Sequence, residues 1–248
     1  NMIIELPSSA SANDFPNNSN SSFKVRLPEK LHLGPGEWKV GLLEAHIPNK
    51  FYNVTVGEIV FESLVGNVFS KHQVTRGFYE SAEKLVRSIN LECETWDVAG
   101  YTGDEYLQLA YDKTANKVTA NIASKGDYTV QFSDDLCAVM GFKNIKLGTG
   151  IHTAHRLANM FTGLSYLYVY TNLVRDRMVG DSHSPLLRAI PLHGSYGDAT
   201  HEFRHVHYIE TTAFNSDVVQ VDIRTDTGEL APFVDGKVLL TLDLQRHV

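Results

Sequence analysis

The tripeptide Asp226-Thr227-Gly228 is the part of the sequence that most resembles a catalytic motif. Aspartic proteases carry the pattern Asp-Ser/Thr-Gly, in which two carboxylates share a proton and activate water. A protease aspartate follows an apolar strand that buries the pair, whereas Asp226 follows polar residues such as Arg224. We therefore predict a turn here, with Gly228 supplying a positive φ. An aspartic-type hydrolase stays the weaker alternative.

Histidines gather in the run THEFRHVHY, at His201, His205 and His207. His205 and His207 would share one face of a strand, as metal ligands can. His201 and His205 would share a face only on a helix, which the neighbouring residues do not support. His152 and His155 form a further pair. Because a metal site needs three or four convergent ligands, we interpret all of these as loop or hydrogen-bonded histidines.

A serine-protease order appears in Asp181, His183 and Ser184. Neighbours in sequence cannot supply the geometry of a catalytic triad, and no G-x-S-x-G elbow is present. We find neither a phosphate-binding loop nor a dinucleotide-binding fingerprint. The sequence therefore predicts a protein that is not an enzyme, with no catalytic, cofactor-binding or metal-binding residues and no cofactor.

The composition indicates a globular protein that does not grip nucleic acid. The chain has 248 residues, 43% of them hydrophobic, and a formal net charge of −7 with histidine neutral. Proteins that grip nucleic acid backbones usually carry a basic excess. Cys93 and Cys137 are too few for a disulfide framework, which favours reduced thiols and synthesis inside a cell. No apolar run reaches the roughly 18 residues that a transmembrane helix requires.

The pattern along the chain predicts two all-β stretches with an insertion between them. From 166 to 246 the sequence consists of short runs rich in Val, Leu, Ile and Tyr, each closed by Gly, Pro, Asp or Asn. Such runs are typical of strands joined by loops. Strands are also expected near the N-terminal side, at 2–6, 23–27, 38–48 and 58–64.

The middle of the chain changes to a mixed pattern. A helix is expected over 79–91, where apolar residues share one face. Three short strands follow between 106 and 132. Ser133 would cap a second helix that Gly141 ends. We interpret 66–150 as a compact α+β lobe inserted into a β domain.

Several short motifs, taken in order, resemble the minor capsid (penton) proteins of Polinton or Maverick elements, adintoviruses and virophages. Each motif is weak alone, but their order and spacing extend over nearly the whole chain. The motifs are Leu6-Pro7-Ser8, Phe15-Pro16-Asn17-Asn18, Leu27-Pro28, Gly36-Glu37-Trp38-Lys39-Val40-Gly41-Leu42, Phe51-Tyr52-Asn53, Leu167-Tyr168-Val169-Tyr170, Val179-Gly180-Asp181, Pro185-Leu186-Leu187-Arg188, Asp226-Thr227-Gly228-Glu229 and Pro232-Phe233.

The resemblance implies an all-β fold, a single jelly-roll β-sandwich with the α+β lobe inserted. We expect residues 1–22 to form a flexible N-terminal arm, 23–65 and 164–248 the jelly-roll sandwich, 66–150 the lobe and 151–163 a connection. Jelly rolls limit their open edges by packing two antiparallel sheets together.

The resemblance also implies a structural role in the virion. Such proteins form homopentamers at the five-fold vertices of an icosahedral capsid of a double-stranded DNA virus or virus-like element. The implied partners are further copies of the chain and a double jelly-roll major capsid protein, with a host receptor as an additional candidate. A receptor- or carbohydrate-binding jelly-roll module remains the alternative.

Overall fold

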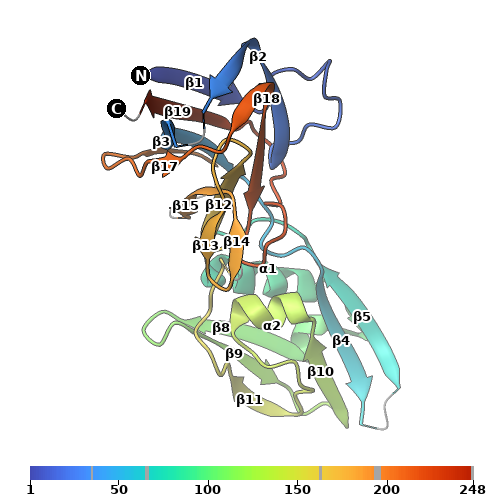
Figure 1. Cartoon of the computed structure of the whole chain (residues 1–248). Coiled ribbons are helices and arrows are strands. Elements are labelled where there is room, and N and C mark those ends of the chain that lie inside the picture. Colours follow the sequence, from blue (N-terminus) through green and yellow to red (C-terminus); the bar gives the residue numbers. More distant parts are fainter. Residues whose placement is uncertain (35, 65–66, 162–163, 193–196, 247–248) are drawn as a thin grey trace. The chain divides into compact units, whose positions relative to one another are not determined.

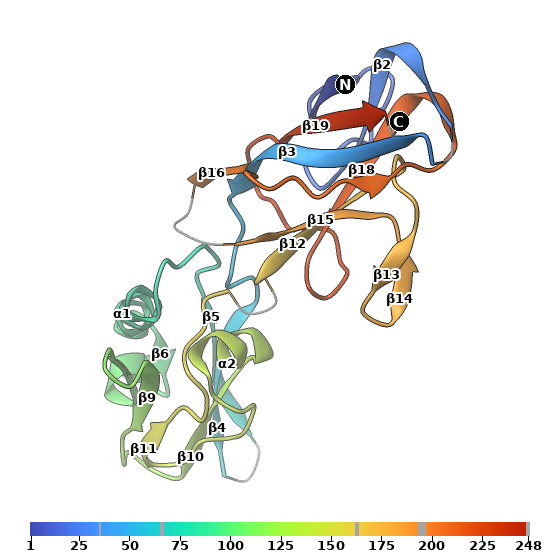
Figure 2. The same ribbon diagram turned by 60° about the vertical axis from the view of Figure 1, so that its left-hand side comes forward.

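The computed structural model describes residues 1–34, 36–64, 67–161, 164–192 and 197–246, and Figures 1 and 2 show it from two sides. The chain divides into two compact units. Asn1–Phe51 and Gly163–Val248 form the first unit, which we call the sandwich, and Tyr52–Thr162 form the second, which we call the lobe.

The sandwich is a jelly roll of eight main strands in the described residues. One sheet has the order β1 (Met2–Pro7), β19 (Leu239–Arg246), β3 (Trp38–Asn49) and β16 (Gly197–Glu202), with the short β17 (Ile209–Glu210) also paired to β3. The other has the order β15 (Leu186–Pro191), β12 (Tyr166–Thr171), β18 (Phe214–Arg224) and β2 (Ser22–Leu33). Numbered along the chain, the strands are arranged 1-8-3-6 and 5-4-7-2, which is jelly-roll order. The predicted fold class is confirmed.

Alternating burial explains why these segments pair as strands around a common core. Every second residue of a strand points to the same face, so a period of two places one set of side chains inside. Fully burying an aliphatic side chain contributes roughly 1.5–3 kcal/mol. The alternating buried positions of β18 and β19 are Val219, Val221, Ile223, Leu240, Leu242 and Leu244.

A short hairpin extends from the sandwich between β12 and β15. It consists of β13 (Arg177–Val179) and β14 (Ser182–Ser184), which pair with each other. Gly180 turns the chain with a φ of 61°, a conformation that glycine adopts without a steric cost. We call this element the β13–β14 hairpin.

The lobe contains two helices and three small sheets in its described residues. The helices are α1 (Ala82–Cys93) and α2 (Asp134–Met140), with a 3-10 turn at Gly103–Glu105. The sheets are β10 (Tyr128–Phe132), β4 (Gly57–Ser63) and β5 (Val68–Val74); β11 (Gly150–Thr153), β9 (Lys117–Ile122) and β8 (Leu107–Asp112); and the pair β6 (Asp97–Val98) and β7 (Tyr101–Thr102). One buried cluster, with members from Val54 to Met160, forms its core.

Both helices of the lobe form as the sequence pattern predicts, although α1 spans Ala82–Cys93 and not 79–91. Ser81 caps α1, and its side chain accepts the N–H of Lys84 at 3.2 Å. Gly141 ends α2 in the left-handed region, at φ 85°. Ser133 precedes α2 but its hydroxyl does not cap the helix. It donates instead to the carbonyl of Val56 at 2.9 Å, which ties α2 to the start of β4.

The boundaries of the lobe differ from the predicted 66–150. The strand at 58–64 was expected in the sandwich, but as β4 it pairs with β10 and β5. Ile59 and Phe61 are fully buried in the lobe core, because alternation indicates one buried face without saying which sheet supplies it. At the other end, the predicted connection 151–163 belongs largely to the lobe, since β11 pairs with β9.

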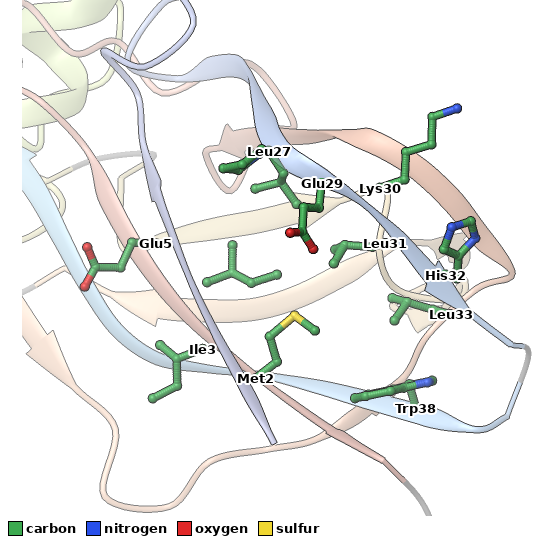
Figure 3. A pocket seen from close by; sticks show the side chains of 12 residues that line it. Met2, Ile3, Glu5, Leu27, Glu29, Lys30, Leu31, His32, Leu33 and Trp38 are labelled. Atoms are coloured by element: carbon green, nitrogen blue, oxygen red, sulfur yellow. The ribbon is translucent and has the colours of Figure 1, made fainter.

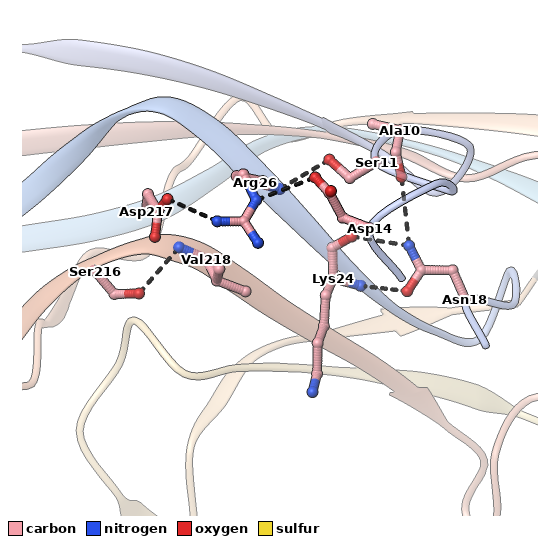
Figure 4. Close-up of polar contacts among 9 residues, drawn as sticks. All are labelled: Ala10, Ser11, Asp14, Asn18, Lys24, Arg26, Ser216, Asp217 and Val218. Atoms are coloured by element: carbon pink, nitrogen blue, oxygen red, sulfur yellow. Dashed lines mark hydrogen bonds and ion pairs between the residues drawn. The ribbon is translucent and has the colours of Figure 1, made fainter. Parts of the chain in front are cut away.

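The N-terminal residues also differ from the predicted flexible arm over 1–22. Met2–Pro7 form β1, which pairs along its length with β19. Residues 8–21 run as turns along the edge of β2 (Figure 4). Arg26 donates to Asp14 and to Asp217, each at 3.1 Å, so it joins this segment to β18. Hydrogen bonds to side chains, which sequence periodicity cannot indicate, hold these residues to the sandwich.

Candidate interaction surfaces

Asp226 occupies a turn, as predicted, and both of its carboxylate oxygens contact the backbone. Oδ2 accepts the N–H of Ser165 and Oδ1 accepts the N–H of Tyr166, each at 3.0 Å. Gly228, at φ 83°, donates its N–H to the carbonyl of Thr225 at 3.0 Å. The carboxylate therefore anchors the start of β12 to the turn after β18, which is a structural role.

The histidines lie on three different parts of the chain. His201 belongs to β16 and is half-buried, whereas His205 and His207 are exposed on the segment after β16. His152 lies on β11 in the lobe, with Nε2 2.7 Å from the carbonyl oxygen of Gly148. Within the described residues, no group of three or more His, Cys, Asp or Glu side chains is placed to hold a metal ion.

The triad-like residues all belong to the β13–β14 hairpin. Asp181 lies in its turn, and His183 and Ser184 follow each other on β14. Successive strand residues point to opposite faces, so the imidazole of His183 and the hydroxyl of Ser184 lie on opposite faces of the hairpin. This geometry cannot pass a proton from the serine to the histidine.

An apolar groove lies at one edge of the sandwich, between β1 and β2 (Figure 3). We call it the β1–β2 groove; its volume is about 500 Å³. β1 and β2 are the end strands of their sheets, each paired on one side only among the described strands. Its apolar lining residues include Met2, Ile4, Leu27, Leu31, Leu33 and Trp38.

A bulge in β2 shapes one wall of this groove. Arg26 pairs with Val218 and Leu31 with Ser216, so residues 27–30 stand opposite Asp217 alone. Pro28 lies in this bulge, where it donates no ladder hydrogen bond, as is usual for proline in an edge strand. The bulge therefore breaks the ladder locally and bends β2 beside the groove.

Glu29 is the charged group that points into the groove. Figure 3 shows its carboxylate between β1 and β2, whereas Lys30 extends away from the groove. Glu29 is exposed, and none of the ion pairs between described residues includes it. The groove thus combines an apolar lining with the carboxylate of Glu29. Glu5 also lines the groove, but Figure 3 shows its side chain extending away on the other side of β1.

A depression of about 380 Å³ lies on the lobe and is lined by aromatic and polar residues, including Trp96, Tyr101 and Glu105. Aromatic faces of this kind can stack on sugar rings. Trp96 is only 9% exposed, and the ring of His72 stacks on it at a centroid distance of 4.7 Å. The ammonium of Lys125 lies 4.7 Å from the ring centroid of Tyr101. One face of each ring is therefore already covered within the lobe.

Of the comparisons with known proteins, the one with solved structures finds matches. No protein-family model matches the sequence, and no curated protein matches it. Among solved structures, the mavirus penton protein superposes with a TM-score of 0.53 at 11% identity, over 99% of both chains. This chain has the fold of the mavirus penton protein. A chain from the cryo-EM structure of the Sputnik virophage gives a TM-score of 0.52 at 10% identity, covering 99% of this chain and 97% of the other.

The penton-protein fold includes both units, because the match extends over nearly the whole of each chain. The fold implied by the sequence resemblance is therefore confirmed. At this identity the likeness is one of fold. In the described residues, no helix has the length and apolar character needed to cross a bilayer.

The groove is the feature that reasoning from the sequence missed. It joins residues from two strand edges that are distant along the chain, and no periodicity reports such a juxtaposition. One signal was present: Pro28 within an otherwise strand-like run marks an edge strand or a bulge.

Proposed function

We propose that this protein is a minor capsid (penton) protein of an icosahedral double-stranded DNA virus or virus-like element. In this proposal it forms homopentamers at the five-fold vertices. The observation that carries the proposal is the full-length likeness to the mavirus penton protein, which includes the inserted lobe as well as the jelly roll. Fold likeness alone leaves function open, so the character of the surfaces matters too.

The surfaces favour a structural role over catalysis. Asp226 binds backbone N–H groups, and the other residues with catalytic potential are separated or oppositely directed. An apolar groove lies between the edge strands β1 and β2. Open strand edges beside apolar surface are typical of a site that another protein covers. The proposal therefore assigns no enzymatic activity to the chain.

The proposed partners follow from the vertex position. Further copies of the chain complete the pentamer, and a double jelly-roll major capsid protein surrounds it. Synthesis inside the host cell precedes incorporation into the virion. The net charge of −7 disfavours direct contact with the packaged DNA.

We also propose that the lobe has a role separate from the pentamer, with a host receptor as its candidate partner. Its buried cluster draws only on residues of the lobe. Asn53, at its start, donates to the carbonyl of Met160, near its end, at 3.1 Å. Because the two ends lie close together, a short Gly/Ser linker can replace 52–162 with the sandwich intact. Pentamers that form without the lobe support this role, and a sandwich that no longer assembles contradicts it.

The proposed pentamer is tested by native mass spectrometry of the purified chain over a range of concentrations. We expect a species of five times the 27.7 kDa chain mass. A dimer, or a chain that stays monomeric at every concentration, contradicts the proposal.

A further inference from the structure

We propose that the β1–β2 groove of one copy receives the β13–β14 hairpin of a neighbouring copy. This inference rests on the proposed pentamer and specifies which two surfaces meet in it. It follows from three properties of the sandwich: the chemistry of the groove, the chemistry of the hairpin, and their separation on the unit.

The groove requires a ligand that is mostly apolar and carries one positive charge. Ile4, Leu31 and Leu33 lie beneath it and are almost fully buried, while Met2 is 38% exposed. An apolar side chain inserted here removes further apolar area from water, at roughly 25 cal/mol per Å². A cation beside it would pair with Glu29, whose carboxylate points into the groove.

The hairpin offers this combination in adjacent residues. Met178 is 81% exposed, the largest fraction for any large hydrophobic side chain that the structure describes. Its neighbour Arg177 is also exposed, and no ion pair between described residues includes it. Methionine adapts readily to irregular apolar surfaces, and arginine forms strong paired hydrogen bonds with carboxylates.

The backbone edges are compatible with the same contact. β1 and β2 are each paired with a strand on one side only, although the turns before β2 cover its edge as far as Arg26, and β13 and β14 pair only with each other among the described strands. Free strand edges carry unpaired N–H and C=O groups that can extend a sheet across an interface. The hairpin can therefore add backbone hydrogen bonds to the side-chain contacts.

The two surfaces lie apart on the sandwich. In both Figure 1 and Figure 2 the β13–β14 hairpin is distant from the N-terminus and β2. A contact between different patches is heterologous: each copy uses its groove for one neighbour and its hairpin for another, and a ring results when the rotation closes. Such a contact can close into a pentamer when the rotation between neighbours suits five copies.

Disulfide trapping tests the contact directly. The variant Met2→Cys/Met178→Cys should form intermolecular disulfides under mild oxidation, in a ladder that ends at five copies. The natural Cys93 and Cys137 are buried and leave the background low. The matched control is Met2→Cys/Ile151→Cys, since Ile151 is 74% exposed but lies on β11 of the lobe. Equal cross-linking of the two variants overturns the inference.

Charge exchange tests the pairing of Glu29 with Arg177. Glu29→Arg and Arg177→Glu should each weaken association by about tenfold or more, because each places like charges together. The double variant should recover most of the lost association.

The outcomes separate this inference from the proposed function. If five-copy rings form and neither single change weakens them, the inference fails while the proposed function stands. If no ring forms in the natural protein, both fail. If Glu29→Arg spares the ring but blocks entry into the capsid, the groove binds another protein and the inference is overturned.

Discussion

The side chain of Asn18 pairs with the backbone of Lys24 as a neighbouring strand would. Its Nδ2 donates to the carbonyl of Lys24 at 2.8 Å, and its Oδ1 accepts the N–H of Lys24 at 2.9 Å. Figure 4 shows this pair beside the salt bridges of Arg26. One asparagine thus occupies part of the free edge of β2 and fixes the preceding turns to it.

The same arrangement recurs twice in the lobe. Asn90 on α1 donates to the carbonyl of Leu109 at 2.8 Å and accepts its N–H at 2.9 Å. Asn53 makes the equivalent pair with Tyr79, at 2.8 and 2.9 Å. In each case an amide side chain satisfies a backbone donor and acceptor that no strand reaches.

We predict that Asn18→Ala loosens the turns over 8–19 without unfolding the sandwich. The backbone groups of Lys24 are exposed and gain water as a partner, so the loss in free energy of unfolding should be about 1 kcal/mol. Limited proteolysis should cleave the variant within this segment faster than the natural protein. Asn17→Ala is the control, because Asn17 is exposed. Equal cleavage of both variants would contradict the prediction.

Asn90→Ala should destabilise the lobe more strongly. The change leaves the N–H and C=O of Leu109 without their partner at a part-buried position, which costs roughly 1–3 kcal/mol. Chemical denaturation followed by tryptophan fluorescence measures this loss in a Trp38→Phe background, which leaves Trp96 of the lobe as the one tryptophan in the sequence. Leu91→Ala on the same helix is the control, since Leu91 is 54% exposed. A loss for Asn90→Ala no greater than that of the control would show that the pair is not stabilising.

The lobe should lose stability at alkaline pH because of its buried thiols. Burial raises the pKa of Cys93 from 9.0 to about 12, and that of Cys137 to about 11. At a pH between 9 and these raised values, the thiols of the unfolded chain are ionised while those of the folded chain stay protonated. The stabilisation is therefore complete below pH 9, declines as the pH rises above 9, and is lost once the pH has passed through the folded values of about 11 and about 12.

Two measurements check this behaviour. The free energy of unfolding of the lobe should fall with pH above 9, and the fall should be smaller in Cys93→Ala/Cys137→Ala. At neutral pH, thiol reagents should leave both cysteines of the folded chain unmodified and react on unfolding. Rapid labelling of the folded protein, or a pH dependence that the double variant retains in full, would refute the account.

Asp226→Asn should leave the fold intact and change stability only modestly. Asparagine keeps one of the two side-chain oxygens that accept the N–H groups of Ser165 and Tyr166. Losing one charge-assisted hydrogen bond at an exposed site should cost about 1 kcal/mol. Thermal unfolding measures the change. Peptide cleavage by the natural protein that Asp226→Asn abolishes would instead establish a catalytic role.

Much of the architecture follows from local sequence patterns. Neighbouring residues in the chain are enough to predict the alternation in β18 and β19. They are also enough to predict the apolar face of α1 and the end of α2 at Gly141. The boundary of the lobe does not follow from local patterns, because the alternation of β4 is equally compatible with either unit. Its membership is decided by pairing with β10, some seventy positions away.

The groove was harder to predict from the sequence than the fold. Met2, Leu31 and Trp38 meet only because β1, β2 and β3 lie together at one edge of the jelly roll. The fixed N-terminal segment was missed for a similar reason, since Ser- and Asn-rich composition is typical of loops whether or not their side chains find partners. Asn18 finds its partner in Lys24.

The central claim is that this chain occupies capsid vertices as a pentamer. The most direct test is cryo-EM of particles assembled from this chain and the double jelly-roll capsid protein of the same virus or element. The account predicts that five copies of the sandwich surround each five-fold axis, with the β1–β2 groove of each facing the next copy. Particles whose vertices contain a different protein, with this chain absent from the shell, would contradict it.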